Sequence, residues 1–236
     1  MAVTPPQLPS TPPEDIGELK TRAQLLAGRC LGQLAALAGL PLPADLSRSK
    51  GLVGNLLERW LGARAGNRPL PDFTHLGIEL KTLPVDSDGK PLQSTYVTKV
   101  PLCDLEALEW RTSSVFAKLR HVMWVPIQAE PAVPLAERVV GQAFFWRPSA
   151  VEEQLLCADW EYHLARIRAG DVNAIKGSDG AVLQVRPKAR SAETITWAEL
   201  PHQRTMPTRP CGFYLRPSFT EYLVQRYFFD AGRPSP

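Results

Sequence analysis

The sequence predicts an α/β protein in which a mixed β-sheet is flanked by helices. Apolar residues recur at every third or fourth position in segments such as 52–61, a spacing typical of amphipathic helices. Short runs rich in branched and aromatic residues, such as 78–83 and 121–127, are typical of strands instead. Helices and strands alternate without a regular strand–helix–strand period, which favours a mixed sheet.

The N-terminal third begins with a leader and continues mainly as helix. Five prolines among the first thirteen residues predict a flexible leader, residues 1–13. Thr11 is the expected cap of the first helix, which Gly28 ends. The helices expected in this part are 12–27, 31–39 and 47–62. The strand over 78–83 then follows a Pro-Asp-Phe turn.

The remaining elements are predicted from strand composition, capping boxes and turn signals. Ser149 and Glu152 form a capping box that begins a long helix ending before Gly170. A hairpin is expected across 173–188, turning at Ser178-Asp179-Gly180, and 191–210 look irregular. The other expected elements are strands at 94–100, 121–127 and 212–216, and helices at 113–120 and about 219–229.

Composition excludes several classes of protein. No apolar run approaches the roughly 20 residues of a membrane span, and the N-terminus lacks the features of a secretory signal. The four cysteines are scattered without a CxxC pair, and the four histidines have no zinc-site spacing. We therefore expect a cytoplasmic protein with reduced cysteines. A metal ion would have to be held by carboxylates, which suits a hard ion such as Mg²⁺.

The positive charge of the chain is concentrated near its C-terminus. The net charge is +3, and residues 181–236 alone contain 8 Lys/Arg against 4 Asp/Glu, a balance of +4. Residues 1–180 contain 19 Lys/Arg against 20 Asp/Glu, a balance of −1. A basic surface in the last quarter would suit a polyanion such as DNA. Solvated surface arginines explain the same counts.

The run DFTHLGIELKTLPVD, residues 72–86, carries the candidate catalytic residues. Because side chains alternate along a strand, Glu79 and Lys81 share one face, and Asp72 could reach that face from the preceding turn. Two carboxylates can hold Mg²⁺ against a scissile phosphate, and a nearby lysine can orient water and offset charge in the transition state. An exposed ion pair on a strand would account for Glu79 and Lys81 equally well.

The surroundings of this run resemble a known family. The segments KGLVGNLLERWLGARAG, PDFTHLGIELKTLPVDSDGKPL, KLRHVMWVPI, PLAERVVG, LQVRPKA and GFYLRPSFT are similar, in collinear order, to the MutH family of mismatch-repair endonucleases. The resemblance covers about residues 16–229. It implies a restriction-endonuclease-like fold of the PD-(D/E)xK superfamily, with two lobes around a DNA-binding cleft. The implied activity is Mg²⁺-dependent nicking of the unmethylated strand at hemimethylated GATC sites, with Mn²⁺ able to substitute and the MutL ATPase as activator.

The resemblance also assigns catalytic roles by matching positions. Asp72, Glu79 and Lys81 would be the catalytic set, with Asp72 and Glu79 as metal ligands. The main-chain carbonyl of Leu80 would be a further ligand. Glu58, on the preceding helix, matches an additional active-site acid, although an exposed helix carboxylate would explain it from the residues alone.

Five further positions match DNA-contacting residues of the family. Lys50, at a helix start, and Lys118 would lie near the DNA backbone, although both also suit ordinary solvated lysines. Arg186 and Lys188 alternate along one strand face and could donate to guanine in the major groove. Tyr214 would lie against the adenine whose methylation is sensed, whereas by itself it is typical of a packed strand aromatic.

The expected organisation is one endonuclease domain over 14–230, with a catalytic lobe of about 14–125, a DNA-reading lobe of about 126–230 and a tail of 231–236. A single copy of the motif and the lack of a dimerisation helix favour a monomeric nickase of the bacterial cytoplasm. Two alternatives stay open. The chain could be a GATC-specific restriction endonuclease, or a non-catalytic DNA-binding module with the same fold.

Overall fold

The computed structural model describes residues 7–43, 51–63, 70–188, 194–202 and 204–229. The chain divides into two units, each with its own sheet. Unit 1 comprises 1–92, 121–146 and 224–236, and unit 2 comprises 93–120 and 147–223. The α/β class with mixed sheets and flanking helices, predicted from the sequence, is confirmed.

The sheet of unit 1 has the strand order β1-β3-β4 and carries the motif at residues 72–86. β1 (Glu79–Val85) pairs in parallel with β3 (Val122–Gln128), so that Glu79 lies opposite Val122. β4 (Phe144–Trp146) pairs antiparallel on the other side of β3. β3 is therefore the central strand, and six of its seven residues are buried. This burial explains its nearly continuous apolar sequence.

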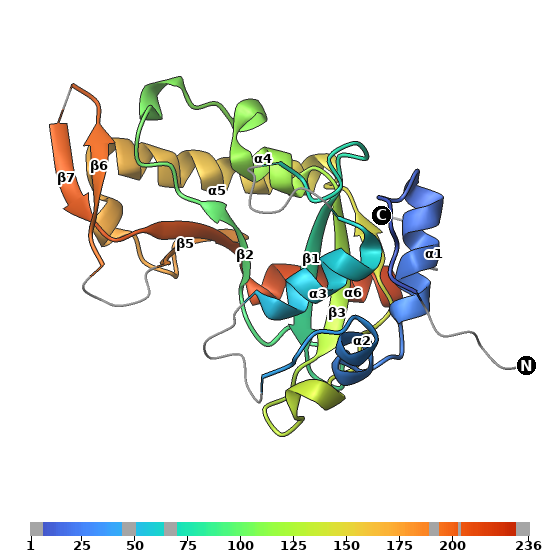
Figure 1. The fold of residues 1–236 in the computed structure, drawn as a ribbon. Helices are drawn as coiled ribbons and strands as arrows, with labels where there is room; N and C mark the ends of the chain where they lie inside the picture. Colours follow the sequence, from blue (N-terminus) through green and yellow to red (C-terminus); the bar gives the residue numbers. More distant parts are fainter. Residues whose placement is uncertain (1–6, 44–50, 64–69, 189–193, 203, 230–236) are drawn as a thin grey trace, which may run out of the picture. The chain divides into compact units, whose positions relative to one another are not determined.

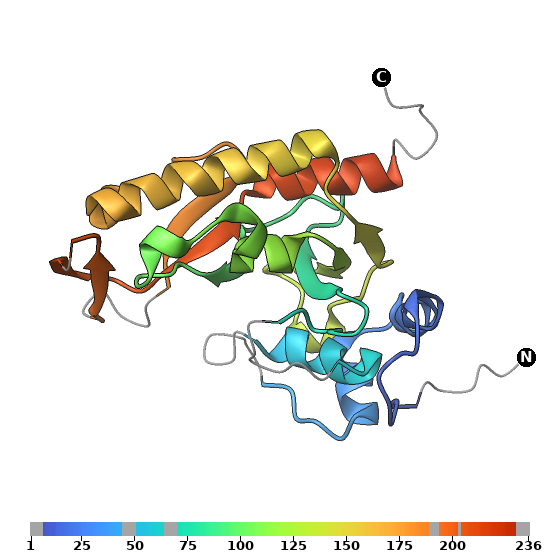
Figure 2. The same ribbon diagram turned by 90° about the horizontal axis from the view of Figure 1, so that it is seen from above.

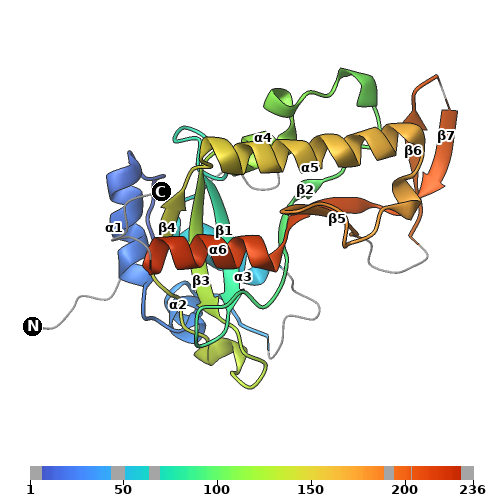
Figure 3. The ribbon, with the colours of Figure 1, turned by 180° about the vertical axis from the view of Figure 1, so that it is seen from behind.

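Three helices of unit 1 pack around one apolar core, and their bounds are α1 (Ile16–Leu26), α2 (Leu31–Leu37) and α3 (Leu52–Leu61). The core includes fully buried Leu57 of α3 and Ile78, the residue just before β1. α3 ends at Gly62, whose positive φ of 81° suits glycine. Figure 1 and Figure 3 show α3 on one side of β1 and β3 and the end of α6 on the other.

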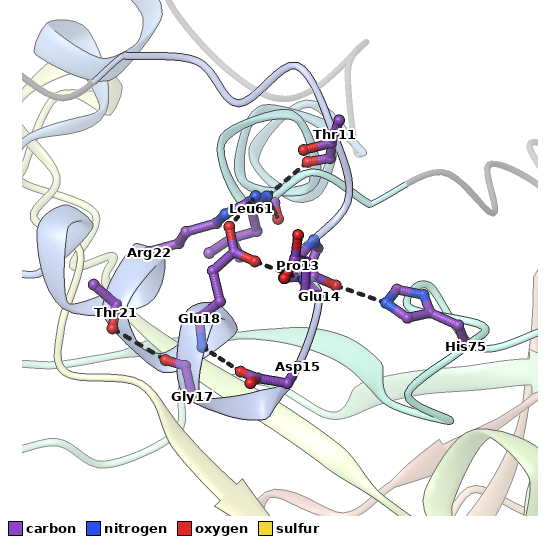
Figure 4. A network of polar contacts seen from close by, with 10 residues as sticks. All are labelled: Thr11, Pro13, Glu14, Asp15, Gly17, Glu18, Thr21, Arg22, Leu61 and His75. Carbon is purple, nitrogen blue, oxygen red and sulfur yellow. Dashed lines mark hydrogen bonds and ion pairs between the residues drawn. The ribbon is translucent and has the colours of Figure 1, made fainter.

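The described part of the leader is held by side chains from two places in unit 1 (Figure 4). Arg22 donates hydrogen bonds to the carbonyls of Thr11 and Leu61, at 2.9 and 3.0 Å. His75 Nε2 lies 2.6 Å from the carbonyl oxygen of Pro13. Two carbonyls of the expected leader over 1–13, those of Thr11 and Pro13, are therefore bound in the structure, and residues 1–6 lie outside the described residues. α1 is capped by Asp15, not by Thr11.

The sheet of unit 2 is antiparallel, with the strand order β2-β8-β5, and its strands are β2 (Thr95–Lys99), β8 (Cys211–Leu215) and β5 (Leu183–Pro187). Figure 2 and Figure 3 show α5 (Ala150–Ala169) running along this sheet. α5 begins at the predicted capping box, in which Ser149 and Glu152 bond each other's backbone N–H. α4 (Ser114–Leu119) packs against β2, and its cap is Ser113.

Two expectations for unit 2 are wrong. The segment before the Ser178-Asp179-Gly180 turn forms a short 3₁₀ helix, so no hairpin pairs with β5 there. Two parts of the segment 191–210, which was expected to be irregular, form a two-stranded ribbon of β6 (Thr196–Leu200) and β7 (Arg204–Thr208). The 3₁₀ helices of the chain are η1 (Leu105–Ala107), η2 (Trp110–Thr112), η3 (Leu135–Glu137) and η4 (Val172–Ala174).

The two units interleave along the chain. β3 pairs in parallel with β1, and a parallel pair needs a long crossover connection. Residues 93–120, which supply β2 and α4 to unit 2, lie within that connection. The expected lobes of 14–125 and 126–230 therefore differ from the two units, because a boundary at 125 cuts through β3. α6 (Pro217–Phe228) continues from unit 2 into unit 1.

Unit 1 ends with aromatic residues from the last turn of α6. Tyr227 stacks on Phe144 of β4 with ring centroids 4.8 Å apart, and Phe228 meets the same ring edge to face. Aromatic pairs in these geometries stabilise a contact beyond the area they bury. None of the helices in the described ranges combines the length and apolar content that crossing a bilayer demands.

The buried histidine of α5 predicts a pH dependence of stability. His163 is fully buried, and this burial lowers its pKa, against the opposing effects of a hydrogen bond to the Leu183 carbonyl and of Asp159 and Asp179 nearby. Arg166 lowers the pKa further. The ring therefore stays neutral in the folded protein at pH values where the unfolded chain, with an ordinary pKa of about 6.5, already binds a proton.

We expect the free energy of unfolding to decrease as the pH falls below about 6.5, because protons then favour the unfolded state. Urea unfolding between pH 7.5 and 5.5 measures this decrease. His163→Gln should show a smaller decrease over the same range, since it removes the titrating group. Equal pH dependence in both proteins would show that other groups cause it.

Candidate active site and DNA-reading face

A short loop brings Asp72 to the beginning of β1. Phe73 and Ile78 form an isolated antiparallel bridge, with the Phe73 N–H donating to the Ile78 carbonyl at 2.9 Å. Gly77 takes a φ of 65° within this loop, a conformation that glycine adopts without strain. The loop thus folds the chain back, and Asp72 Oδ2 accepts a hydrogen bond from the Leu80 N–H at 2.8 Å.

Glu79 and Lys81 form an ion pair on one face of β1. Lys81 Nζ lies 2.7 Å from Glu79 Oε1, and the two side chains are only 11% and 4% exposed. The exposed ion pair considered from the sequence is therefore wrong, because water reaches neither group freely. Charges removed from water interact more strongly than at a surface and are costly to leave unpaired. The strand start is fixed by the Glu79 N–H, which donates to the His121 carbonyl at 3.0 Å.

Glu58 lies on α3, which packs against β1, and its side chain is half-buried. Its Oε1 atom lies 4.0 Å from where a Cβ on Gly54 would be, so the carboxylate is directed back along its own helix. In the described ranges, no three Asp, Glu, His or Cys side chains lie close enough together to hold a metal ion. The contacts that the structure shows beside β1 are those of Asp72 with the Leu80 N–H and of Glu79 with Lys81, and Glu58 lies on the neighbouring helix.

The donor atoms beside β1 suit a hard divalent ion. Asp72 and Glu79 offer carboxylate oxygens. Leu80, which lies between Glu79 and Lys81 in the strand, offers a main-chain carbonyl. Oxygen ligands of this kind are those that Mg²⁺ prefers, and Mg²⁺ commonly takes only one or two protein carboxylates. Two carboxylates, both at least nine-tenths buried, therefore fit a magnesium site completed by substrate oxygens.

The β2-β8-β5 sheet gathers the predicted DNA-reading side chains on one face. Gln184 of β5 lies opposite Tyr214 of β8, and Arg186 lies opposite Gly212. On the other side of β8, Tyr96 of β2 also lies opposite Tyr214. Paired residues share a face of a sheet, and alternate residues of a strand do so as well. Tyr96, Gln184, Arg186 and Tyr214, with Lys188 beyond the end of β5, are called the reading face below.

Polar contacts fix the cationic side chains of the reading face. Ser94 Oγ accepts hydrogen bonds from Gln184 Nε2 at 2.8 Å and from Arg186 Nη1 at 2.9 Å. Lys188 Nζ lies 3.2 Å from the centre of the Tyr96 ring, a close cation–π contact. Arg186 and Lys188 are themselves exposed. The two cations are thus oriented by neighbours and open to a polyanion.

The two tyrosines of the reading face are packed together. The rings of Tyr96 and Tyr214 meet at 66° with centroids 5.3 Å apart. A Cβ on Gly212 would lie 2.9 Å from Tyr96 and 3.1 Å from Tyr214, so only glycine leaves room for this pair. Burial raises the pKa of Tyr96 to about 12 and raises that of Tyr214. Both phenols are therefore neutral at physiological pH.

Sequence reasoning missed Tyr96, Ser94 and Gln184. The alternation of Ser94 and Tyr96 along a predicted strand was visible, but their position depends on pairing between β2 and β8, more than a hundred residues apart. Lys118, on α4, is only 9% exposed, which differs from the solvated lysine considered from the sequence. Lys50 lies outside the described residues.

Among the described residues, cavities of about 230 and 380 Å³ lie in unit 2. Trp110 and Phe116 line the first, and Val185 and Pro187 line the second, on the side of β5 opposite Arg186. Neither is lined by Asp72, Glu79 or Lys81. An extended polymer substrate binds along a surface, so we assign the chemistry from the side chains beside β1 and not from cavity size.

Tyr96→Ala is expected to weaken binding to duplex DNA by about tenfold, since Lys188 loses the ring that orients it and Tyr214 loses its packing partner. Tyr96→Phe should bind like the unaltered protein, because the ring is retained. Fluorescence anisotropy with a labelled duplex, at one fixed salt concentration, measures both. Equal weakening by the two variants would place the effect in the hydroxyl group instead.

Comparison with known proteins was made on the whole chain. Residues 61–159 match the family described as "MutH: DNA mismatch repair enzyme MutH". A protein from Enterobacter sp. (strain 638) named "DNA mismatch repair protein MutH" is 47% identical over 218 residues, which cover 92% of this chain and 95% of that protein. Proteins of the same name from Shewanella woodyi and Klebsiella pneumoniae (strain 342) are also 47% identical, covering 92% and 93% of this chain and 94% and 95% of theirs.

Proposed function

The chain belongs to the MutH family, and we propose that it is the mismatch-repair endonuclease that nicks the unmethylated strand at hemimethylated GATC sites. The observation that carries this proposal is the buried group beside β1. There Asp72 accepts from the Leu80 N–H at 2.8 Å, and Glu79 pairs with Lys81 at 2.7 Å. Two carboxylates and a lysine are the groups that metal-assisted hydrolysis of a phosphodiester requires.

In this mechanism Asp72, Glu79 and the Leu80 carbonyl would hold Mg²⁺, or Mn²⁺ in its place. When bound, the ion supplies Lewis-acid chemistry and offsets negative charge on the scissile phosphate. Lys81 has three N–H donors, so it can donate to Glu79 and to a phosphate oxygen of the substrate at the same time. The hydrogen bond to the Leu80 N–H orients the Asp72 carboxylate before substrate arrives. Glu58 would act from α3 as an auxiliary acid.

The reading face would select the DNA sequence. Arg186 and Lys188 would donate to guanine O6 and N7, a contact typically worth ~1–3 kcal/mol of discrimination. Tyr214 would lie against the adenine that carries or lacks a methyl group, since its ring is apolar and its hydroxyl polar. Lys50 and Lys118 would contact phosphates. The two-lobed cleft expected from the sequence belongs to this proposal, with unit 1 cutting and unit 2 reading one duplex.

We also propose that the protein has MutL as its partner, acts as a monomer and is located in the bacterial cytoplasm. MutL would raise the nicking rate at saturating DNA. The protein would act as a monomer, because the sequence contains a single Asp72–Glu79–Lys81 motif and nicking needs only one active site. Its target, chromosomal DNA, would place it in the bacterial cytoplasm.

The test uses purified protein, Mg²⁺ and a duplex with one GATC methylated on one strand and a different label on each strand. We expect a metal-dependent nick confined to the unmethylated strand and lost in Asp72→Ala. Cleavage of both strands in one binding event would indicate a restriction enzyme instead. No cleavage, even with MutL and ATP, would leave a DNA-binding module that lacks nuclease activity.

A further inference from the structure

One face of α5 holds the loop that leads into β5, the strand of Arg186. Asp159, His163 and Arg166 follow each other at four- and three-residue spacing, so they lie on one stripe of the helix. All three contact the segment 176–183 or its carbonyls. None of the three belongs to the catalytic group beside β1 or to the reading face.

Asp159 makes the most contacts in this stripe. Its Oδ1 accepts a hydrogen bond from the Ala181 N–H at 2.8 Å, and its Oδ2 accepts from the N–H groups of Val182 and Leu183 at 2.7 and 2.8 Å. The side chain is 8% exposed. Hydrogen bonds to a buried carboxylate are stronger than neutral ones and are costly to lose. One side chain therefore binds three consecutive backbone groups.

Further contacts fix the same loop. His163 Nε2 is 3.0 Å from the Leu183 carbonyl, so both backbone groups of the first residue of β5 are bound by α5. Arg166 pairs with Asp179 at 3.0 Å. A Cβ on Gly180 would lie 2.0 Å from the Leu183 carbonyl oxygen, so the turn between them leaves room only for glycine.

The position of this loop decides which side chains β5 presents. β5 is at the edge of its sheet and pairs only with β8 there, so one ladder alone sets its register. A slip of one residue would turn Gln184 and Arg186 to the opposite face. The ladder is closed at both ends, where the Arg216 N–H donates to the Val182 carbonyl at 2.9 Å and the Lys188 N–H donates to the Pro210 carbonyl at 2.7 Å. Asp159 adds three further hydrogen bonds at the near end, from outside the ladder.

We propose that Asp159 is a positioning residue that sets the register of β5, and thereby which face Arg186 and Lys188 present to DNA. This inference rests on the proposed function, in which those residues read the sequence. Asp159, a buried carboxylate of unit 2, would thus affect sequence discrimination although it does not contact the DNA.

The test compares Asp159→Asn with Glu161→Gln, which removes the same charge from an exposed position of α5. The amide retains one acceptor oxygen and turns an NH₂ group toward backbone N–H donors, so the loop is released without a change of size. For each protein, KM and kcat are measured on a GATC duplex and on a duplex with one base pair of the site altered. Asp179→Asn serves as a milder second variant that releases the outer part of the loop.

We expect Asp159→Asn to reduce the preference for GATC by about tenfold through KM, with kcat on GATC retained within about twofold. Asp179→Asn should give a smaller reduction, and Glu161→Gln none. A merely structural role would lower the active fraction, which changes kcat on both duplexes equally and leaves the preference intact. That result would overturn the inference. An unaltered protein without GATC preference would instead overturn the proposed function.

Discussion

Glu79→Gln is expected to reduce the nicking rate by about 10³-fold or more, the largest effect of any single change in the chain. Glutamine keeps the size of the side chain but removes the negative charge. At 3% exposure, Glu79 has little water to compensate for that loss. The variant would lose a proposed metal ligand, and the partner of Lys81 at 2.7 Å becomes a neutral amide.

Single-turnover nicking of a hemimethylated GATC duplex measures this effect, because it separates the chemical step from product release. DNA binding without metal should change little, since Glu79 lies in unit 1 and the reading face in unit 2. Glu109→Gln, an exposed acid of unit 2, is the control for the charge change and should nick normally. Nicking within tenfold of the unaltered protein would remove Glu79 from the mechanism.

Lys81→Met is expected to lower the rate by about 10²- to 10⁴-fold, the range typical of losing a general acid–base group. Methionine fills the space of the lysine stem, so β1 should keep its pairing with β3 while Glu79 loses its ammonium partner. Lys90→Met, on the exposed turn after β1, is the matched control.

The double variant Glu79→Gln, Lys81→Met tests whether the pair acts as a unit. We expect it to be about as slow as the slower single variant, because residues of one catalytic group show effects that do not add. Rates that multiply would mean that Glu79 and Lys81 act independently, and the 2.7 Å ion pair would then have no part in the reaction.

The catalytic group could be predicted because its geometry is local. Glu79 and Lys81 share a face through the two-residue period of a strand, and only seven residues separate Asp72 from Leu80, whose N–H donates to it. The side chain of Glu58 could not be placed in this way. Its direction along α3 depends on how the helix packs on β1, and helical period alone does not determine it.

The reading face was predicted only in part. Arg186 and Lys188 were named from the resemblance to the family, and their alternation along one strand predicted that they share a face. Ser94 and Tyr96 orient these two cations, but they lie just before and within β2, which reaches the face through β8. Pairing between strands so far apart in the chain has no signature in a local window of residues.

The wrong hairpin has a physical cause as well. Ser178-Asp179-Gly180 is a strong turn signal, and Gly180 does adopt a positive φ of 86°. The backbone after the turn bonds to Asp159 of α5 and not to a strand before it. A tertiary contact with a helix thus replaced the local pairing that the turn residues predicted.

The interleaving of the two units determines the order in which the chain can fold during synthesis. A ribosome produces β1 and its carboxylates well before β3, since all of 93–120 comes between them and belongs to unit 2. Domains generally form as their residues emerge. β1 therefore stays without its full parallel pairing to β3 until about residue 128 has left the exit tunnel. A truncated chain that ends before Val122 cannot contain β1 paired with β3.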